Sequence, residues 1–172
     1  PNIVLIFVDD MGYGDLGCYG NKRNKTPNID RLAAEGQRWT SFYSSGAWCV
    51  PSRTGLMTGR HPHLFAGKMD LPKTRDKLMA SMLKQQGYAT AILGKWHLAG
   101  YPQDFTKSPM HPLECGVDYH FGTPGSNDVP APPGKRQTRS LFDACDKFTF
   151  KVPLIRGREL IEVPTDQELL TK

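Results

Sequence analysis

The chain has 172 residues, of which 38% are hydrophobic and 23% are charged, a composition suited to one globular domain with its own core. The formal net charge is +5 and the mean hydropathy is −0.47, and no apolar run approaches the roughly 20 residues of a membrane span. The basic residues are dispersed and no nucleic-acid-binding motif accompanies them. We therefore expect no membrane span, no nucleic-acid partner, and a weak preference for anionic substrates.

A continuous apolar run from Ile3 to Val8 opens the chain and predicts a central strand buried on both faces. Asp9 and Asp10 follow it directly, and a glycine-rich segment comes next. Open α/β sheets bind ligands at the carboxyl ends of their strands, and carboxylate oxygens are the ligands that calcium and magnesium require. The same Asp-Asp-x-Gly pattern is also typical of a simple turn. Both interpretations stay open at this point.

The segment from Thr26 to Gly36 carries the signals of a helix. Thr26 suits the N-cap, Pro27 suits the first helical position, and Gly36 suits the end. Its apolar residues share one face: Ile29, Leu32 and Ala33. The alternating residues from Trp39 to Tyr43 predict a further strand.

The residues 49–53, Cys-Val-Pro-Ser-Arg, continue through an apolar run to Thr-Gly-Arg at 58–60. Pro51 suits the first turn of a helix, so we expect Cys49 where a loop enters that helix. Free N–H groups and the positive end of the helix dipole would face an anion placed there. Arg53, one turn later, adds a planar cation suited to tetrahedral oxyanions.

A cysteine can also be a small buried hydrophobe or half of a disulfide, and these alternatives apply to Cys49 taken by itself. A zinc site is not expected, because the cysteines include no C-x-x-C pair. The four cysteines are Cys18, Cys49, Cys115 and Cys145.

The residues 76–86 predict a second amphipathic helix, which Gly87 ends. Tyr88 to Leu93 predicts a strand that leads into Gly-Lys-Trp-His at 94–97. The order strand, helix, strand favours an α/β fold with a mostly parallel central sheet and helices on both faces. The expected apolar stripe of the helix, with its methionines as core residues, is Leu78, Met79, Met82 and Leu83.

The last third of the chain is rich in proline and glycine up to Gly134. Residues 116–122 predict a short strand, and residues 126–128 lie in a loop that could border a substrate cleft. Residues 154–161 predict a hairpin around Arg-Gly, and Thr165 to Glu168 has the pattern of a capping box. Three histidines lie next to prolines in loops and are lesser candidates for substrate contact: His61, His63 and His111.

Three of these patterns together resemble the sulfatase family, within the alkaline phosphatase superfamily. They are the paired aspartates 9–10, the run 49–60, and Gly-Lys-Trp-His at 94–97. The resemblance is strong from Pro1 to about Gly100 and looser to Lys172. It implies a mostly parallel α/β fold of the alkaline phosphatase and sulfatase type. It also implies that residues 1–172 are the N-terminal part of the catalytic domain, without the rest of that domain or a small C-terminal domain.

The resemblance implies that Cys49 becomes formylglycine. A dedicated maturing enzyme oxidises the cysteine in the pattern Cys-x-Pro-x-Arg, which Cys49, Pro51 and Arg53 match. The hydrated aldehyde carries two hydroxyls on one carbon. One attacks sulfur and expels the alcohol, and the other loses its proton and expels sulfate, so one hard displacement becomes two easier steps.

The remaining site roles also follow from the resemblance. Asp9 and Asp10 match the pair that binds a divalent cation, usually calcium, with magnesium as a substitute. Lys95 would supply a point charge to the sulfate and to the hydroxyl, and His97 would handle the proton of the second hydroxyl. A sulfatase has a further Asp, Asn, His and Lys in its later part, which have no match in this sequence.

Three functions remain open. The first is a sulfuric ester hydrolase, and the second is a hydrolase of phosphate esters or phosphonates, since sulfate and phosphate are both tetrahedral. The run through Thr-Gly-Arg at 58–60 favours sulfate. The third is a non-catalytic fragment that keeps the fold. The partners implied are a sulfate ester and the maturing enzyme, and the family resemblance implies a secreted, periplasmic or lysosomal protein.

Overall fold

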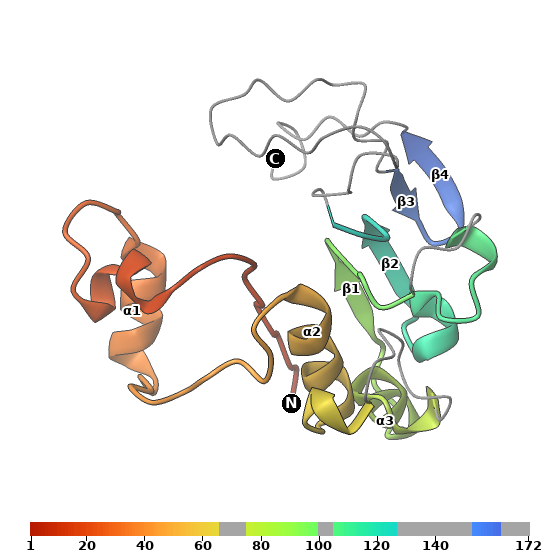
Figure 1. Ribbon diagram of the computed structural model, residues 1–172, viewed down its shortest axis with the longest axis horizontal. Helices are drawn as coiled ribbons and strands as arrows, with labels where there is room; N and C mark the ends of the chain where they lie inside the picture. Colours follow the sequence, from red (N-terminus) through yellow and green to blue (C-terminus); the bar gives the residue numbers. More distant parts are fainter. Residues whose placement is uncertain (66–74, 100–104, 127–152, 163–172) are drawn as a thin grey trace. The chain divides into compact units, whose positions relative to one another are not determined.

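The computed structural model describes residues 1–65, 75–99, 105–126 and 153–162, and Figure 1 shows their helices and strands. The chain forms two compact units, Pro1–Ser44 and Ser45–Lys172, which are described separately below. Two of the predicted segments, residues 127–128 and the capping box at 165–168, lie outside the described residues. In the described part, no helix is both long enough and apolar enough to cross a membrane.

The first unit contains two 3₁₀ turns, η1 (Tyr13–Asp15) and η2 (Gly17–Tyr19), followed by helix α1 (Pro27–Glu35). Helix α1 begins after Thr26 and ends at Gly36, as predicted. The Thr26 hydroxyl, however, does not cap its own helix. It accepts the N–H of Gly17 at 2.8 Å and donates to Asp30 Oδ1 at 3.0 Å, so it joins η2 to α1.

The two strands predicted for this unit are absent from it. Residues 3–8 have no strand assignment and are exposed, with Val4 at 86% and Ile6 at 74%. Residues 39–43 likewise form no strand, and Tyr43 is 77% exposed. A strand is defined by hydrogen bonds to a neighbour, and the unit 1–44 holds no other strand that could provide them. Apolar sequence alone therefore did not produce a buried strand.

The second unit contains a four-stranded sheet in the order β1-β2-β3-β4. Strand β1 (Ala91–Leu93) runs parallel to β2 (Tyr119–Gly122), whereas β2 pairs antiparallel with β3 (Leu154–Arg156), and β3 with β4 (Glu159–Glu162). The α/β class is confirmed, but within the described residues the sheet is mixed, with one parallel and two antiparallel pairings, so the expectation of a mostly parallel sheet is not exact. Strands β3 and β4 pair antiparallel because the tight turn that joins them permits no other direction.

The predicted hairpin at 154–161 is confirmed as β3 and β4. Gly157 occupies the turn with φ +57°, a left-handed conformation that glycine adopts at little cost. Its N–H donates to the carbonyl of His120 in β2 at 2.7 Å. The hairpin is therefore anchored to β2 by its turn as well as by its strands.

The predicted helix at 76–86 is interrupted. A 3₁₀ turn, η4 (Arg75–Lys77), precedes α3 (Met79–Gln85), because Leu78 between them is extended (φ −80°, ψ 150°). Leu78 is fully buried, as expected, but Met82 is 56% exposed, so its prediction as a core residue is wrong. Gly87 ends the helix with φ +84°. The strand predicted for 88–93 is shortened to 91–93.

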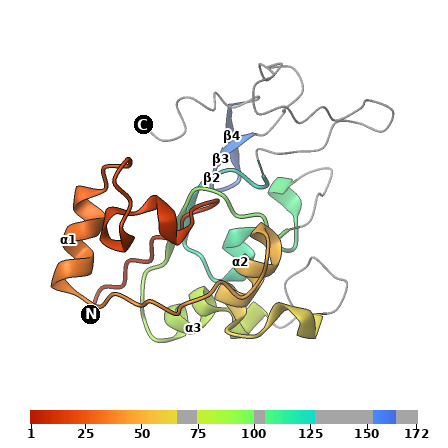
Figure 2. The ribbon, with the colours of Figure 1, turned by 60° about the vertical axis from the view of Figure 1, so that its left-hand side comes forward.

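Helix α2 (Cys49–Thr58) packs beside α3, as the two views agree (Figures 1 and 2). Helix α2, the segment after β1 and the sheet all contribute residues to one hydrophobic core. Helix α2 contributes Val50 and Met57 to it, and the segment after β1 contributes Trp96 and Leu98. Both motif-bearing segments of this unit are therefore fixed on the same apolar cluster. Its other buried members are Leu78, Ala80, Phe105, Cys115, Val117 and Ile155.

Candidate functional site

Cys49 is the first residue of α2, where the sequence predicts it. The preceding Trp48 makes no side-chain cap, so no N-cap side chain competes for the first N–H groups of the helix. Cys49 is half-buried, and its thiol forms no disulfide in the described part of the chain. A group joined to this side chain would lie at the positive end of the helix dipole.

The loop before α2 is held close to the helix start by a glycine. A Cβ on Gly46 would lie 2.5 Å from Pro51 Cβ and 2.9 Å from Ser52 N, closer than real Cβ atoms come. Only glycine allows this approach. The backbone on both sides of Cys49 is therefore closely packed.

Arg53 joins the two motifs of the second unit. Its Nη1 donates to the carbonyl oxygen of Lys95 at 2.7 Å, across 42 positions of sequence. A charge-assisted bond of this kind, between half-buried residues, is stronger than a neutral one. The structure thus brings the Cys-x-Pro-Ser-Arg helix and the Gly-Lys-Trp-His segment together, as the resemblance implies.

The Lys95 ammonium donates to Ser126 Oγ at 3.2 Å. Ser126 is buried, and sequence analysis assigned it only to a loop that could border a cleft. No local pattern identifies this partner, because 31 positions separate the two residues. The Lys95–Ser126 bond is therefore a polar contact to a candidate site residue that the sequence did not predict.

His97 follows Trp96, which is 2% exposed and donates from Nε1 to the Met110 carbonyl at 2.9 Å. His97 is itself buried, with 5% of its surface exposed. Its backbone has φ +56°, which is unfavourable for a residue other than glycine. The convergence of the Lys95 and His97 side chains on Cys49 stays a prediction.

Asp10, in the first unit, shares this strained geometry. Its φ is also +56°, and in the described ranges Asp10 and His97 are the two non-glycine residues with positive φ. Both residues belong to the motifs at 9–10 and 94–97. Residues in sparsely populated conformations cost about 1–3 kcal/mol each and cluster at functional sites. The observation supports a functional assignment for both.

Asp9 and Asp10 are exposed in the first unit. Adjacent carboxylates fit a hard divalent cation, but calcium takes about six to eight oxygen ligands. Within the described residues, no three His, Cys, Asp or Glu side chains gather closely enough to hold a metal ion. The pair therefore fits part of a cation site and is insufficient for a whole one.

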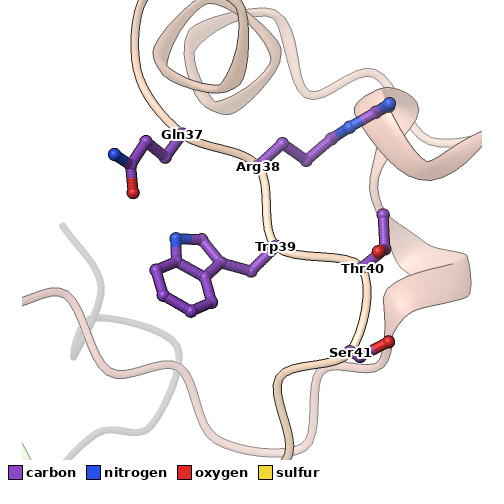
Figure 3. Close-up of a pocket in the computed structure, with 5 residues that line it drawn as sticks. All are labelled: Gln37, Arg38, Trp39, Thr40 and Ser41. Carbon is purple, nitrogen blue, oxygen red and sulfur yellow. The ribbon is translucent and has the colours of Figure 1, made fainter.

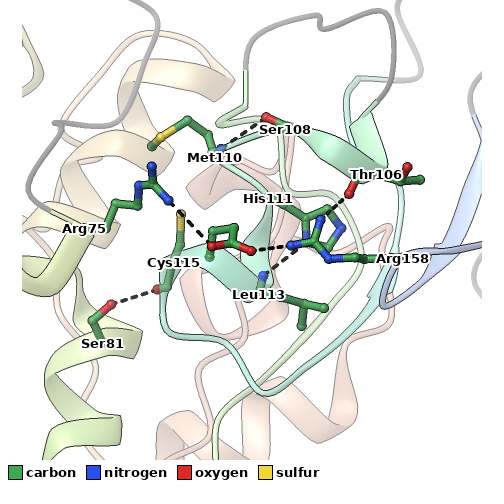
Figure 4. A network of polar contacts seen from close by, with 10 residues as sticks. Arg75, Ser81, Thr106, Ser108, Met110, His111, Leu113, Cys115 and Arg158 are labelled. Atoms are coloured by element: carbon green, nitrogen blue, oxygen red, sulfur yellow. Dashed lines mark hydrogen bonds and ion pairs between the residues drawn. The ribbon is translucent and has the colours of Figure 1, made fainter.

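A second polar cluster lies away from these motifs, around η6 (Pro112–Cys115), and Figure 4 shows it. His111 is fully buried, so it is not a substrate-contacting loop residue, and its Nδ1 accepts the N–H of Leu113 at 3.2 Å. Burial, assisted by the nearby Arg158, lowers the pKa of His111. Burial raises the pKa of Cys115 to about 12, which keeps that thiol protonated and unreactive.

The other lesser candidates do not form a site. His61 and His63 are exposed, with their ring centroids 4.2 Å apart. A surface hollow in the first unit is lined by five consecutive residues, 37–41, and Figure 3 shows their side chains. These residues include no cysteine, histidine or carboxylate. The hollow therefore lacks the groups that the predicted chemistry needs.

Comparison with known proteins decides the family. The Sulfatase family model matches residues 1–155. The chain belongs to the sulfatase family. It is 40% identical to human steryl-sulfatase over 148 residues, which are 78% of this chain and 25% of that protein. It is also 40% identical to bovine arylsulfatase A over 171 residues, 90% of this chain and 32% of that protein.

The solved structure of Ps i-CgsB resembles this one with a TM-score of 0.71 and 32% sequence identity. The match covers 94% of this chain and 37% of that chain. The fold is therefore of the sulfatase, alkaline phosphatase-like type. This sulfatase chain spans about a quarter to just over a third of the length of these three proteins.

Proposed function

We propose that this protein is the nucleophile-bearing part of a sulfuric ester hydrolase. Formylglycine made from Cys49 would attack the sulfur of a sulfate ester at a divalent-cation site, releasing the alcohol and then sulfate. The observation that carries the proposal is the Arg53–Lys95 hydrogen bond of 2.7 Å. It joins the cysteine-bearing helix to the Lys-Trp-His segment within one packed unit.

Each residue of the second unit has a role that its position supports. Cys49, at the helix start, places the reacting group where backbone N–H groups favour an anion. Arg53 and Lys95 add two positive charges to the sulfate group, and a desolvated, preorganised charge stabilises a developing anion far more than water does. His97 would accept the proton of the hydroxyl whose loss releases sulfate.

In the first unit, Asp9 and Asp10 would hold the divalent cation through their carboxylates. We propose calcium, with magnesium as a substitute, because both prefer oxygen ligands. The cation would supply positive charge next to the sulfate oxygens. Two carboxylates are too few for calcium, so the proposal requires further oxygen ligands besides Asp9 and Asp10.

Sulfate is favoured over phosphate by the relatives. Human steryl-sulfatase and bovine arylsulfatase A, each 40% identical, are both named for sulfate hydrolysis. We further propose that a sulfatase-maturing enzyme modifies Cys49, and that the protein is secreted, periplasmic or lysosomal, as the family resemblance implies.

The proposal is tested by detecting the chemical modification of Cys49. The full-length protein is produced in a host that contains the maturing enzyme, and the Cys49 peptide is analysed by mass spectrometry for conversion of thiol to aldehyde. A hydrazide reagent should label the same peptide. Cys49→Ala should lose both the label and aryl sulfate hydrolysis. Cys49→Ser should accept sulfate once and then stop, because a single hydroxyl cannot eliminate it.

Cys18→Ala is the matched control, since Cys18 is also a free, half-buried cysteine but lies outside the motif. It should keep the label and the activity. We expect the 172-residue chain alone to be modified without turning over substrate, because its described residues supply only part of a cation site. Aryl sulfate hydrolysis that survives in Cys49→Ala would refute the mechanism, whereas a formylglycine-containing protein that hydrolyses no sulfate ester would favour the phosphate-directed or non-catalytic alternatives.

A further inference from the structure

The segment that carries Lys95 and His97 is built on β2. The N–H of Gly94 donates to Phe121 O at 2.8 Å, that of Trp96 to Thr123 O at 3.0 Å, and that of His97 to Pro124 O at 3.0 Å. These bonds continue the parallel pairing of β1 and β2 beyond the end of both strands. These hydrogen bonds to β2 and to the residues that follow it therefore fix the backbone positions of Lys95 and His97.

Gly122 lies at the centre of this contact. A Cβ placed on it would lie 2.5 Å from the carbonyl carbon of Gly94 and 2.7 Å from Gly94 Cα, and closer still to the carbonyl oxygen. In proteins a Cβ atom essentially never lies within 3.0 Å of a heavy atom to which it is not bonded through its own or a neighbouring residue. All three obstructing atoms belong to backbone, so no side-chain rotation can relieve the overlap. Any larger residue at 122 must push Gly94 away from β2.

A displacement of Gly94 would also move the candidate site residues that follow it. Lys95 is the next residue after Gly94, and its carbonyl accepts the Arg53 bond of 2.7 Å while its ammonium donates to Ser126 at 3.2 Å. His97 is held at φ +56°, a conformation that persists only where surrounding contacts enforce it. A shift of about 1 Å would lengthen these bonds and release that conformation.

We propose that Gly122 is a positioning residue, whose missing side chain lets β2 hold Lys95 and His97 in their catalytic positions. The catalytic consequence rests on the proposed function, whereas the positional one does not. The three nearest atoms that a Cβ on Gly122 would meet belong to the Gly94 backbone, so Gly122 acts through Gly94. Its role is distinct from a general need for glycine in strands, because the obstructing atoms belong to the segment that bears the site.

The test compares Gly122→Ala with Gly116→Ala in the full-length protein. A Cβ on Gly116 would overlap the Ser81 backbone, and Gly116 has φ +87°, so this control also combines a backbone overlap with conformational strain. Gly116 follows η6, and its carbonyl accepts the Thr90 hydroxyl at 2.7 Å, so the control perturbs that region instead of Gly94. Both variants should be less stable. Gly122→Ala alone should lower kcat, by about 100-fold, as expected for a displacement of catalytic groups by about 1 Å.

Rates are expressed per folded, formylglycine-containing molecule, so that lost stability does not imitate lost catalysis. A crystal structure of Gly122→Ala should show residues 94–97 moved from β2 and the Lys95–Ser126 bond broken. Equal rates per folded molecule for both variants, with residues 94–97 unmoved, would overturn the proposal. If the parent protein hydrolyses no sulfate ester while Gly122→Ala still displaces residues 94–97, the positioning role stands and the proposed function fails.

A second variant keeps the test decisive if Gly122→Ala does not fold. Pro124→Gly leaves the carbonyl that accepts the His97 N–H but gives its backbone more freedom. We expect kcat to fall by about 3–10-fold, with the pH dependence of kcat altered, because a loosened His97 transfers its proton less effectively. An unchanged kcat and pH profile in Pro124→Gly would count against the positioning role of this strand.

Discussion

The two units of the chain differ in whether their apolar residues are buried. In the first unit, residues 3–8 are the most continuous apolar run of the chain, yet they are exposed, and Leu16 is the one buried residue of that unit. In the second unit, β1 has only three residues, but it pairs with β2 over a closed core. The difference shows that a strand depends on a hydrogen-bonding neighbour more than on its own apolar content.

The same contrast applies to the candidate site. Arg53, Lys95 and His97 lie in the second unit, where named hydrogen bonds and a common core hold them. Asp9 and Asp10 lie exposed in the first unit, next to the exposed apolar run. Substitutions in the second unit should therefore affect stability and activity together. Substitution of the aspartates should affect activity with little change in the stability of the chain.

The largest effect is expected for Asp9→Asn in the full-length protein. Loss of one carboxylate ligand should lower sulfatase activity by about 10²–10³-fold and weaken calcium binding, measured by titration calorimetry. Because Asp9 is exposed, the unfolding midpoint should hardly change. Glu35→Gln, an exposed carboxylate of α1, is the control and should keep full activity. Full activity of Asp9→Asn in the presence of a chelator would contradict the cation assignment.

A matched pair of leucines tests the contrast in burial. Leu98 is 1% exposed in the core of the second unit, and Leu32 is 61% exposed on α1. In the 172-residue chain, Leu98→Ala should reduce the free energy of unfolding by about 3 kcal/mol, through lost burial and a cavity. Leu32→Ala should change it by about 0.5 kcal/mol or less. Equal losses in urea unfolding would show that the first unit buries its apolar residues as well.

The buried histidines make the second unit sensitive to acid. His120 is fully buried, with its ring centroid 5.9 Å from that of His111. Burial lowers the pKa of His120 from 6.5 to about 4, with the neighbouring His111 adding to the shift. The neutral ring therefore stabilises the fold fully above pH 6.5. That contribution, at most about 3 kcal/mol, is lost as the pH falls from 6.5 through 4.

Urea unfolding of the 172-residue chain at pH 7.5 and pH 4.5 measures this loss. His120→Phe should make stability less dependent on pH over this range, because phenylalanine cannot take up a proton. His63→Phe replaces an exposed histidine and should leave the pH dependence as it is. The explanation fails if His120→Phe retains the full loss of stability in acid.

The smallest expected change in stability comes from breaking one ion pair in each unit. Glu114 pairs with Arg158 and, at 3.7 Å, with Arg75, so it links η4, η6 and the β3–β4 turn. These side chains are about 40% exposed, and Glu114→Gln should therefore cost no more than about 1 kcal/mol. Glu35→Gln breaks the more exposed Arg31–Glu35 pair of α1 and should cost about 0.3 kcal/mol. A larger loss from Glu35→Gln in urea unfolding would reverse the comparison.

Local signals in the sequence determined several elements correctly. Thr26, Pro27 and Gly36 bound α1, Cys49 begins α2, and Gly157 forms the hairpin turn. In each case the cause is a backbone preference of one or two residues, which acts without help from distant parts of the chain. The motifs at 9–10, 49–60 and 94–97 likewise identified the family through residue types at fixed spacing.

Tertiary structure decided what depends on distant partners. Whether residues 3–8 and 39–43 formed strands depended on a neighbour, and so did the antiparallel pairing of β3 with β2. The Arg53–Lys95 and Lys95–Ser126 bonds join residues 42 and 31 positions apart, which no local pattern encodes. Gly122 shows the limit most clearly. Its sequence neighbours indicate only a strand, and its importance arises because the backbone of Gly94 occupies the space where a side chain would be.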